Sequence, residues 1–152
     1  MTRVPLGRGP EFDLIRQLLG AERALPGGVR VGPGDDCAVL EGGVVVSCDL
    51  TVEGVHFRRE WITLEDAGYR AAASALSDLA AMAAEPLGIL LSMALGPRDP
   101  AGEAAALQAG AEEACRREGV AILGGDLSAS AGPLVVDVVA MGRAEAPVLR
   151  AG

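Results

Sequence analysis

The chain has 152 residues, half of them hydrophobic, with 13 basic and 21 acidic side chains and a formal net charge of -8. This length allows one domain with a sizeable core, and the acidic balance argues against non-specific nucleic-acid binding, which needs basic surface to displace counterions. The most apolar stretch, near 87–95, is too short to cross a membrane, so we predict neither a nucleic-acid nor a membrane partner.

The first third of the chain predicts one helix and a pair of strands. Apolar residues at helical spacing indicate a helix over 11–19, which Gly20 ends. The stretch 26–34 is rich in glycine, proline and arginine and indicates a loop. Two strands, 37–40 and 44–48, then flank the turn Gly42-Gly43.

The rest of the chain alternates helices and strands. Thr63 and Asp66 resemble a capping box that opens a long alanine-rich helix, which Pro86 must end. Asp99 can cap a second helix that begins at Pro100 and runs to about residue 118. The remaining strands are predicted at 88–95, at 120–123 as a short buried strand leading into a turn over 124–126, and at 134–141. This order indicates an α/β domain, a two-layer α+β fold over residues 1–142, with the helices on one face of the sheet.

The second face of this sheet also needs cover. Valines occur in runs, at 44–46 and 135–139, instead of alternating with polar residues, so both faces of these strands are expected to be buried. Two helices can cover only one face. We predict a homodimer through the sheet, in a barrel-like interface; the alternative is a partner domain beyond residue 152.

The cysteines indicate the compartment. Cys37, Cys48 and Cys115 are too few and too widely spaced for a zinc knuckle, and their odd number argues against a disulfide framework. Reduced thiols in a cytoplasmic protein are the simplest interpretation.

Four short acidic segments punctuate a chain that contains no lysine. They are GDD at 34–36, SCDLTVEGVHF at 47–57, SDLAAM at 77–82 and GGD at 124–126. Carboxylates gathered in one place raise one another's pKa unless a cation lies among them. Oxygen ligands suit magnesium or calcium, and magnesium is commonly held by carboxylates together with a substrate's phosphates. The segments therefore suggest a site for a magnesium–nucleotide complex.

Each aspartate also has a simpler explanation. Asp36 and Asp126 follow glycines and are ordinary turn residues when taken alone, and Asp49 can cap the end of a strand. Asp78 is the strongest candidate, because it lies among small apolar residues near a helix C-terminus, where the helix dipole disfavours negative charge. An ion pair with an arginine is the competing explanation for Asp78.

His56 is the only histidine, and a lone histidine is more often structural than catalytic. It follows Asp49 on a glycine-containing segment and can hydrogen-bond a substrate phosphate. Several mechanisms are excluded: a P-loop needs a lysine, a phosphoaspartate enzyme needs a second aspartate where the chain has Thr51, and no serine accompanies the histidine as in a nucleophile elbow.

Taken together, these motifs resemble the N-terminal half of bacterial thiamine-monophosphate kinase, of the superfamily that includes aminoimidazole ribonucleotide synthetase and selenophosphate synthetase. The resemblance covers nearly the whole chain and rests on GDDCAVL, VSCDLTVEGVHF, DAGYRAAASALSDLAAMAAEP, GGDLSAS and GRAEAPVLRAG. It implies transfer of the ATP γ-phosphoryl group to thiamine monophosphate, giving thiamine diphosphate.

The resemblance also implies roles for individual residues. The metal ligands for Mg²⁺ would be Asp36, Ser47, Cys48, Asp49, Asp78 and Asp126; His56 would bind thiamine monophosphate; and Gly125, Asp126 and Arg150 would bind ATP. Cys48 stands where the family usually has threonine, and a thiol is a poor magnesium ligand unless the backbone makes the contact. The acceptor is itself an ionised phosphate, so no catalytic base is expected.

The chain departs from the family in length, since these kinases have a second domain. Residues 143–152 would begin the linker to that domain, and we expect little kinase activity from the 152-residue chain alone. Two alternatives stay open. One is another ATP-dependent enzyme of the same superfamily acting on a different small molecule, and the other is a noncatalytic dimerisation or nucleotide-binding module.

Overall fold

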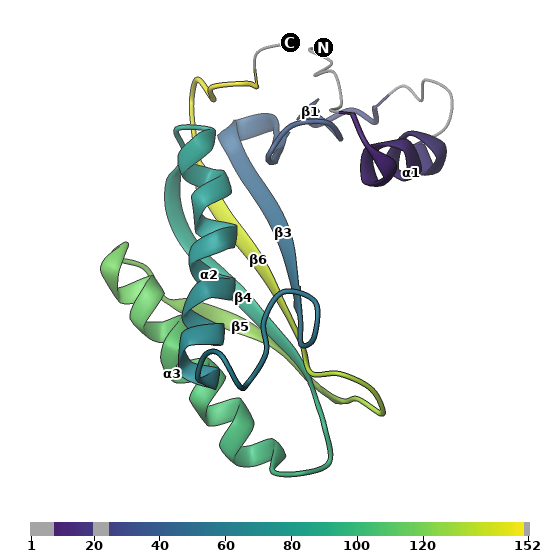
Figure 1. Ribbon diagram of the computed structural model, residues 1–152. Helices are drawn as coiled ribbons and strands as arrows, with labels where there is room; N and C mark the ends of the chain where they lie inside the picture. The colour runs from purple at the N-terminus through teal and green to yellow at the C-terminus, as the bar shows by residue number, and fades with distance from the viewer. Residues whose placement is uncertain (1–7, 20–24, 151–152) are drawn as a thin grey trace.

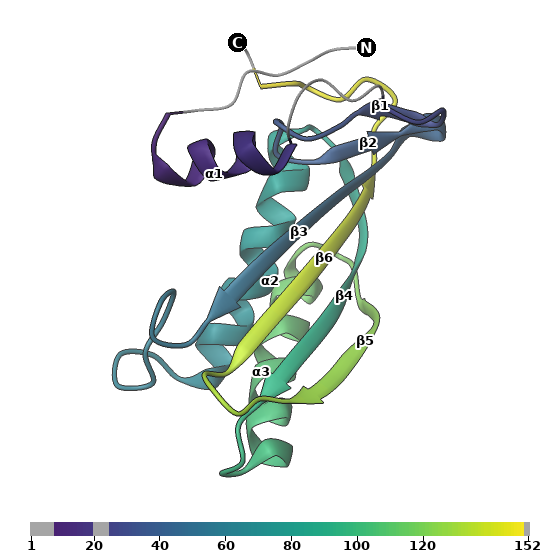
Figure 2. The same cartoon turned by 90° about the vertical axis from the view of Figure 1, so that its right-hand side faces the viewer.

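A computed structural model describes residues 8–19 and 25–150 of the chain, and in it a six-stranded sheet carries two long helices on one face (Figures 1 and 2). The sheet order is β1-β2-β3-β6-β4-β5, and β4 and β5 form its parallel pair. The elements are α1 (Pro10–Leu19), β1 (Val29–Val31), β2 (Ala38–Leu40), a 3-10 turn (Glu41–Gly43), β3 (Val44–Val52), α2 (Leu64–Ala81), β4 (Glu85–Leu95), α3 (Pro100–Arg117), β5 (Ile122–Ala129) and β6 (Val135–Arg143).

The predicted two-layer fold is confirmed, with the helices on one face. Gly20, predicted to end the first helix, lies outside the described residues. No helix in residues 8–19 and 25–150 is long and apolar enough to cross a membrane. The cysteines Cys37, Cys48 and Cys115 are all free.

Both long helices begin at side-chain caps that the sequence predicts. The Thr63 hydroxyl accepts a hydrogen bond from the Asp66 amide at 3.0 Å, and the Asp66 carboxylate accepts one from the Thr63 amide at 3.1 Å. At α3 the Asp99 carboxylate accepts from the Gly102 amide at 3.1 Å. These contacts satisfy amides that the first helical turn leaves without partners.

Glycines allow α2 and α3 to pack with their backbones nearly in contact. An ideal Cβ on Gly68 would lie 2.0 Å from the Leu107 carbonyl oxygen, and one on Gly110 would lie 1.8 Å from the Glu65 carbonyl oxygen. Neither position has room for a side chain. Several alanines of α2, including Ala71, Ala72 and Ala75, are also buried.

The prediction for the segment after α3 is wrong in two respects. A short buried strand at 120–123 was expected to lead into a turn, but β5 continues through the glycine pair to Ala129 and is exposed along nearly its whole length. The reason is its pairing with β4, in which Leu91 lies opposite Gly125. A Cβ on Gly125 would lie 1.7 Å from the Leu91 carbonyl oxygen, so the glycine permits close approach of the two strands.

The two faces of the sheet differ in cover. Residues that point toward the helices, such as Val45, Val136 and Val138, have no exposed surface, whereas Leu50 on the opposite face is 51% exposed. We call this second surface the bare face; it carries Val46, Cys48, Leu50, Leu90, Ser92, Asp137 and Val139 in register across β3, β6 and β4. Among the described residues no element covers it (Figure 2).

Candidate functional site

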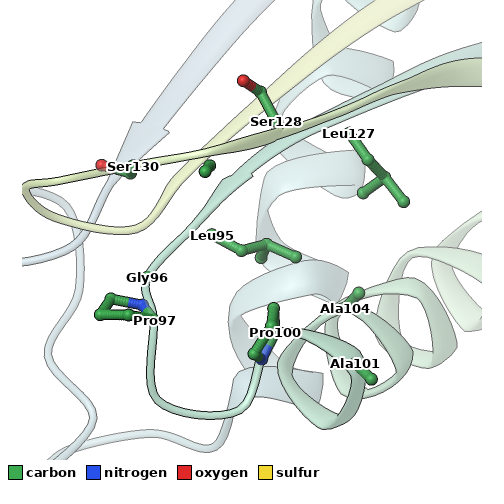
Figure 3. Close-up of a pocket in the computed structure, with 10 residues that line it drawn as sticks. Leu95, Gly96, Pro97, Pro100, Ala101, Ala104, Leu127, Ser128 and Ser130 are labelled. Atoms are coloured by element: carbon green, nitrogen blue, oxygen red, sulfur yellow. The ribbon is translucent and has the colours of Figure 1, made fainter.

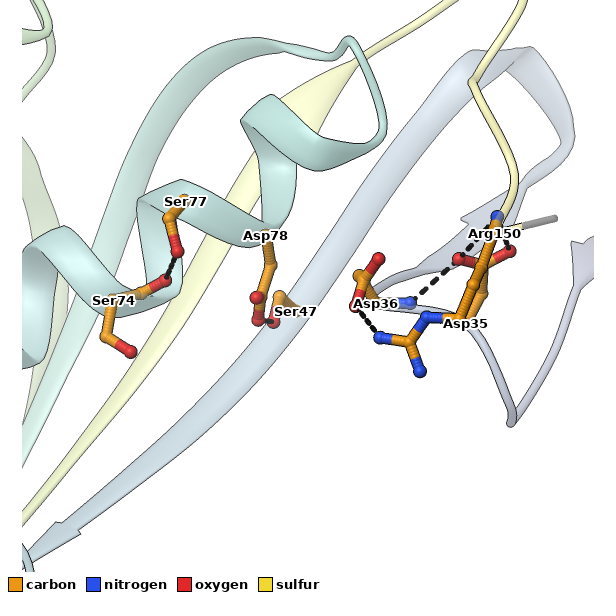
Figure 4. Close-up of polar contacts among 7 residues, drawn as sticks. All are labelled: Asp35, Asp36, Ser47, Ser74, Ser77, Asp78 and Arg150. Carbon is orange, nitrogen blue, oxygen red and sulfur yellow. Dashed lines mark hydrogen bonds and ion pairs between the residues drawn. The ribbon is translucent and has the colours of Figure 1, made fainter. Parts of the chain in front are cut away.

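The contact between β3 and α2 brings two predicted residues together on the helix-covered side of the sheet. The hydroxyl of Ser47, which is buried, donates a hydrogen bond to an Asp78 carboxylate oxygen (Figure 4). Strand alternation places Asp49 on the same side as Ser47. The Asp78 side chain therefore points at the sheet, toward the strand that carries the second acidic motif.

The surroundings of Asp78 disfavour its negative charge. Burial is the largest cause that raises the pKa of Asp78, and the charges of Asp49 and Asp36 raise it further. The Ser47 hydrogen bond and the positive charge of Arg150 act in the opposite direction. A bound cation would relieve the same repulsion.

The acidic turn after β1 meets the C-terminal segment at this site. The Arg150 guanidinium forms an ion pair with Asp36, and the Arg150 backbone amide donates to both carboxylate oxygens of Asp35, at 3.2 and 3.3 Å (Figure 4). Asp35 also accepts from the Asp36 amide at 2.9 Å. The sequence predicted Arg150 as an ATP contact and did not predict its pairing with Asp36.

Cys37 lies next to the cluster but stays a neutral thiol. Burial, followed by the charges of Asp78 and Asp36, raises the pKa of the Cys37 thiol to about 12. These surroundings therefore disfavour the thiolate form at neutral pH.

Two predicted metal ligands point away from this cluster. The Cys48 thiol lies on the bare face and donates to the Asp137 carboxylate at 3.2 Å, because successive residues of a strand face opposite sides. Asp126 lies opposite Ser92 in β4, and Ser92 lies opposite Asp137 in β6, so Asp126 belongs to the bare face as well. Two strands separate Asp126 from Asp49, a distance of roughly 14 Å across the sheet.

His56 and Gly125 also lie apart from the cluster. His56 is exposed on the loop after β3, where its Nδ1 accepts a hydrogen bond from the Val52 amide at 3.0 Å. Gly125 lies within β5, and its close approach to Leu91 gives it a structural role that the sequence did not predict.

A separate hollow of about 480 Å³ lies between the end of β4, the start of α3 and β5 (Figure 3). Its walls are mostly apolar, and the hydroxyls of Ser128 and Ser130 are its side-chain hydrogen-bonding groups; the other lining residues are Leu95, Gly96, Pro97, Pro100, Ala101, Ala104, Leu127 and Ala129. Leu127 points toward the helix side and Ser128 away from it (Figure 3). The hollow contains none of the predicted site residues.

The cluster matches the chemistry of a magnesium site in its donor atoms. Residues 8–19 and 25–150 contain no group of three or more His, Cys, Asp or Glu side chains already close enough to hold a metal ion. The oxygens of Asp36, Ser47, Asp49 and Asp78 are hard ligands of the kind that Mg²⁺ prefers. After burial, the charges of Asp49 and Asp36 contribute to the raised pKa of Asp78, and Asp36 is paired with Arg150.

Sequence reasoning missed two residues of these surfaces. Asp35 belongs to the same GDD motif as Asp36, but the motif alone does not say which carboxylate faces the cluster. Asp137 is a single charge within a valine run, and that contrast with its neighbours was a signal that was overlooked.

The sequence of the chain is similar to those of known proteins. A family described as AIR synthase related protein, N-terminal domain, matches residues 34–144. Thiamine-monophosphate kinase of Mycobacterium tuberculosis is 40% identical over 147 residues, covering 93% of this chain and 44% of that protein. The same enzyme of Rhodopirellula baltica is 39% identical over 153 residues, covering 93% and 48%.

Solved structures give the same result. One described as AaThiL complexed with AMPPCP and TMP superposes with a TM-score of 0.76 at 27% identity, covering 93% of this chain and 43% of that one. The chain spans less than half the length of the curated relatives described above.

Proposed function

Because the chain belongs to the AIR synthase-related family and matches the N-terminal half of thiamine-monophosphate kinases, we propose that it takes part in ATP-dependent phosphorylation of thiamine monophosphate to thiamine diphosphate. The observation that carries the proposal is the hydrogen bond between Ser47 and Asp78, with the charges of Asp49 and Asp36 close by. This arrangement gathers oxygen ligands of the kind that a Mg–nucleotide complex would need.

The residues of the cluster would act mainly by positioning. Asp78 and Asp49 would hold Mg²⁺, and Ser47 would fix the orientation of the Asp78 carboxylate. Magnesium bound there would neutralise charge on the phosphates. Arg150 now pairs with Asp36 and would transfer to an ATP phosphate, which suits the planar guanidinium well.

The acceptor end of the reaction would involve His56. The thiamine phosphate is ionised near neutral pH, so it needs a hydrogen-bond donor and correct alignment more than it needs a base. The phosphoryl transfer therefore needs no side chain as a general base.

We also propose that a second copy of the chain covers the bare face and supplies Asp126 to the nucleotide site. The support is its placement: Asp126 lies on the bare face in β5, across the sheet from Asp78, on a strand that is exposed in the isolated chain. A symmetric dimer brings one surface of each copy to the other, so a residue distant in one chain can be close in the pair.

The test is a coupled assay for ADP release with ATP, Mg²⁺ and thiamine monophosphate, on protein of native length purified from its own gene. Asp78→Asn should reduce Mg-dependent ATP affinity by about tenfold to hundredfold, because a half-buried carboxylate ligand is lost. Asp13→Asn, a change on the exposed surface of α1, is the matched control and should have no effect. Unchanged ATP affinity in Asp78→Asn would remove the central residue of the proposal.

The same assay separates the two alternatives. Turnover with another small acceptor but none with thiamine monophosphate would indicate a different enzyme of the superfamily. Binding of Mg–ATP without turnover on any acceptor would indicate a noncatalytic nucleotide-binding or dimerisation module.

A further inference from the structure

The loop between β3 and α2 has a tightly defined backbone although its tip is exposed. The His56 amide donates to the Val52 carbonyl at 2.9 Å, and the Gly54 amide donates to the Phe57 carbonyl at 2.7 Å. Phe57 is buried and anchors the loop in the core. The loop stands at the edge of the sheet beyond the end of β3 (Figure 2).

The hydrogen bonds of His56 fix which ring nitrogen carries the proton. The Val52 amide donates to Nδ1 at 3.0 Å, so Nδ1 must keep its lone pair. In the neutral ring the proton is then on Nε2. The Arg70 guanidinium also donates to the His56 carbonyl oxygen at 2.9 Å, which holds the residue from its backbone side.

Arg59 ties this loop to a different helix. Its guanidinium donates two hydrogen bonds to Glu53, at 2.6 and 3.0 Å, and a third to Glu103 in the first turn of α3. Arg59 is the main cause that lowers the pKa of Glu53, and the two carboxylates raise the pKa of Arg59. All three side chains line a cavity of about 220 Å³.

The ion pair between Arg59 and Glu103 is stronger evidence that the loop is fixed to α3 than an exposed ion pair would be. Exposed ion pairs contribute little to stability, but Glu103 is only 6% exposed, and its Oε2 has no hydrogen-bond partner among the described residues. Arg59 is therefore the neutralising group for a buried carboxylate. Removing it would leave that charge uncompensated and would drive the loop and α3 to rearrange.

We propose that Arg59 is a positioning residue, which latches the His56 loop to α3 so that His56 offers Nε2–H as a preset hydrogen-bond donor to an anionic group of the substrate. The last step rests on the proposed function, in which that group is the phosphate of thiamine monophosphate. The latch and the tautomer are properties of the chain itself and can be measured without substrate.

The first experiment measures the ring of His56 by nitrogen-15 NMR on the 152-residue chain, where it is the only histidine and needs no assignment. We expect the Nε2–H tautomer in the neutral ring. Arg59→Gln should convert the single set of ring signals into an averaged or mixed one, and Arg59→Lys should restore it in part. Arg58→Gln is the matched control, because Arg58 lies in the same loop but stacks over Trp61, 5.2 Å from the ring centroid.

Two outcomes would overturn the latch: a dominant Nδ1–H tautomer in the unchanged chain, or ring signals in Arg59→Gln identical to those of Arg58→Gln. If Arg59→Gln fails to fold, Glu103→Gln serves as the second variant, because it removes the charge and keeps a hydrogen-bond acceptor. Its His56 signals should broaden or split, and unchanged signals would also overturn the latch.

The second experiment measures kinetics on the native-length protein. Arg59→Gln should raise KM for thiamine monophosphate by about tenfold, with kcat within about twofold and ATP affinity unchanged, because a misplaced donor weakens binding of one substrate. A kcat loss with unchanged KM would contradict the positioning role. If Arg59→Gln alters the His56 tautomer but His56→Ala has no effect on KM for thiamine monophosphate, the latch is supported. The assignment of His56 to the substrate is then refuted.

Discussion

The two faces of the central sheet differ in how far the rest of the chain covers them. On the covered face, valines such as Val136 and Val138 have no exposed surface, because α2 of the same chain packs over their strand. On the bare face, Leu50 is half-exposed and the Cys48 thiol pairs with Asp137. The covered face is therefore buried within one chain, whereas the bare face is exposed in the described residues.

The predicted site residues divide between these faces in the same way. Ser47, Asp49 and Asp78 lie on the covered side, close to Asp36 and Arg150. The Cys48 thiol and Asp126 lie on the bare side. The covered side thus carries most of the acidic cluster, whereas the bare side carries Asp126 and the Cys48 thiol.

The largest expected effect comes from disturbing the covered layer. Gly110→Ala should lower the free energy of unfolding by about 2–3 kcal/mol, since a Cβ there would lie 1.8 Å from the Glu65 carbonyl oxygen and the helices would have to separate. This loss should appear although alanine is the better helix former by about 1 kcal/mol. Urea denaturation followed by circular dichroism measures it.

Gly27→Ala is the control for this prediction, because a Cβ at Gly27 would meet no atom within 4 Å. A Gly110→Ala variant as stable as the parent would show that α2 and α3 do not pack as closely as described.

The next effect tests the bare face. Leu50→Glu places a charge on a surface that a homodimer would bury twice, so the self-association constant should fall by about hundredfold while the monomer fold is kept. Analytical ultracentrifugation measures the association. Leu18→Glu, a change at a 77% exposed position of α1, should leave it unaltered. A parent chain that stays monomeric at millimolar concentration would contradict the dimer proposal.

A smaller effect tests whether the two faces cooperate in one active site. In protein of native length, Asp78→Asn and Asp126→Asn should each be nearly inactive alone. The two variants are then mixed in equal amounts, unfolded and refolded together. If Asp126 acts across the dimer, the mixture should recover about a quarter of the parent activity, because half of the dimers contain one copy of each variant and one of the two sites in such a dimer is intact. Recovery no higher than either variant alone would place both residues in the same chain's site.

Local sequence signals predicted the parts of the fold that depend on local interactions. The capping contacts at Thr63 and Asp99 follow from the chemistry of the first helical turn. Pro86 was expected to end the first long helix, but α2 already ends at Ala81, because Ala83 has a left-handed backbone conformation with φ 52°, and Pro86 lies in β4. The course of β5 was predicted wrongly, because its extension past Gly125 depends on pairing with β4. That pairing is not visible in the residues of β5 themselves.

The candidate site shows the same limit. Asp78 could be singled out from its sequence neighbours, since a carboxylate among small apolar helix residues must have a reason to be there. Cys48 was grouped with Ser47 and Asp49, although strand alternation already places its side chain on the opposite face. The pairing of Arg150 with Asp36 joins distant segments, and no local pattern could have predicted it.

The smallest effect is expected on a third surface, the exposed side of α3, where Glu113 forms ion pairs with Arg116 and Arg117 of the same helix. Hydrogen bonds from Arg116 and then Arg117 lower the pKa of Glu113 from 4.5 to about 2. An acid whose pKa is lower in the folded state stabilises the fold at pH values above its unfolded pKa. This contribution is lost as the pH falls from about 4.5 toward about 2. Glu113→Gln should therefore lower Tm slightly at neutral pH and low salt, and the difference should vanish in high salt or strong acid. Thermal melts at two salt concentrations measure this difference in Tm. A Tm loss as large as that of Gly110→Ala would contradict the prediction, because it would show that this surface charge matters as much for stability as the packing of α2 against α3.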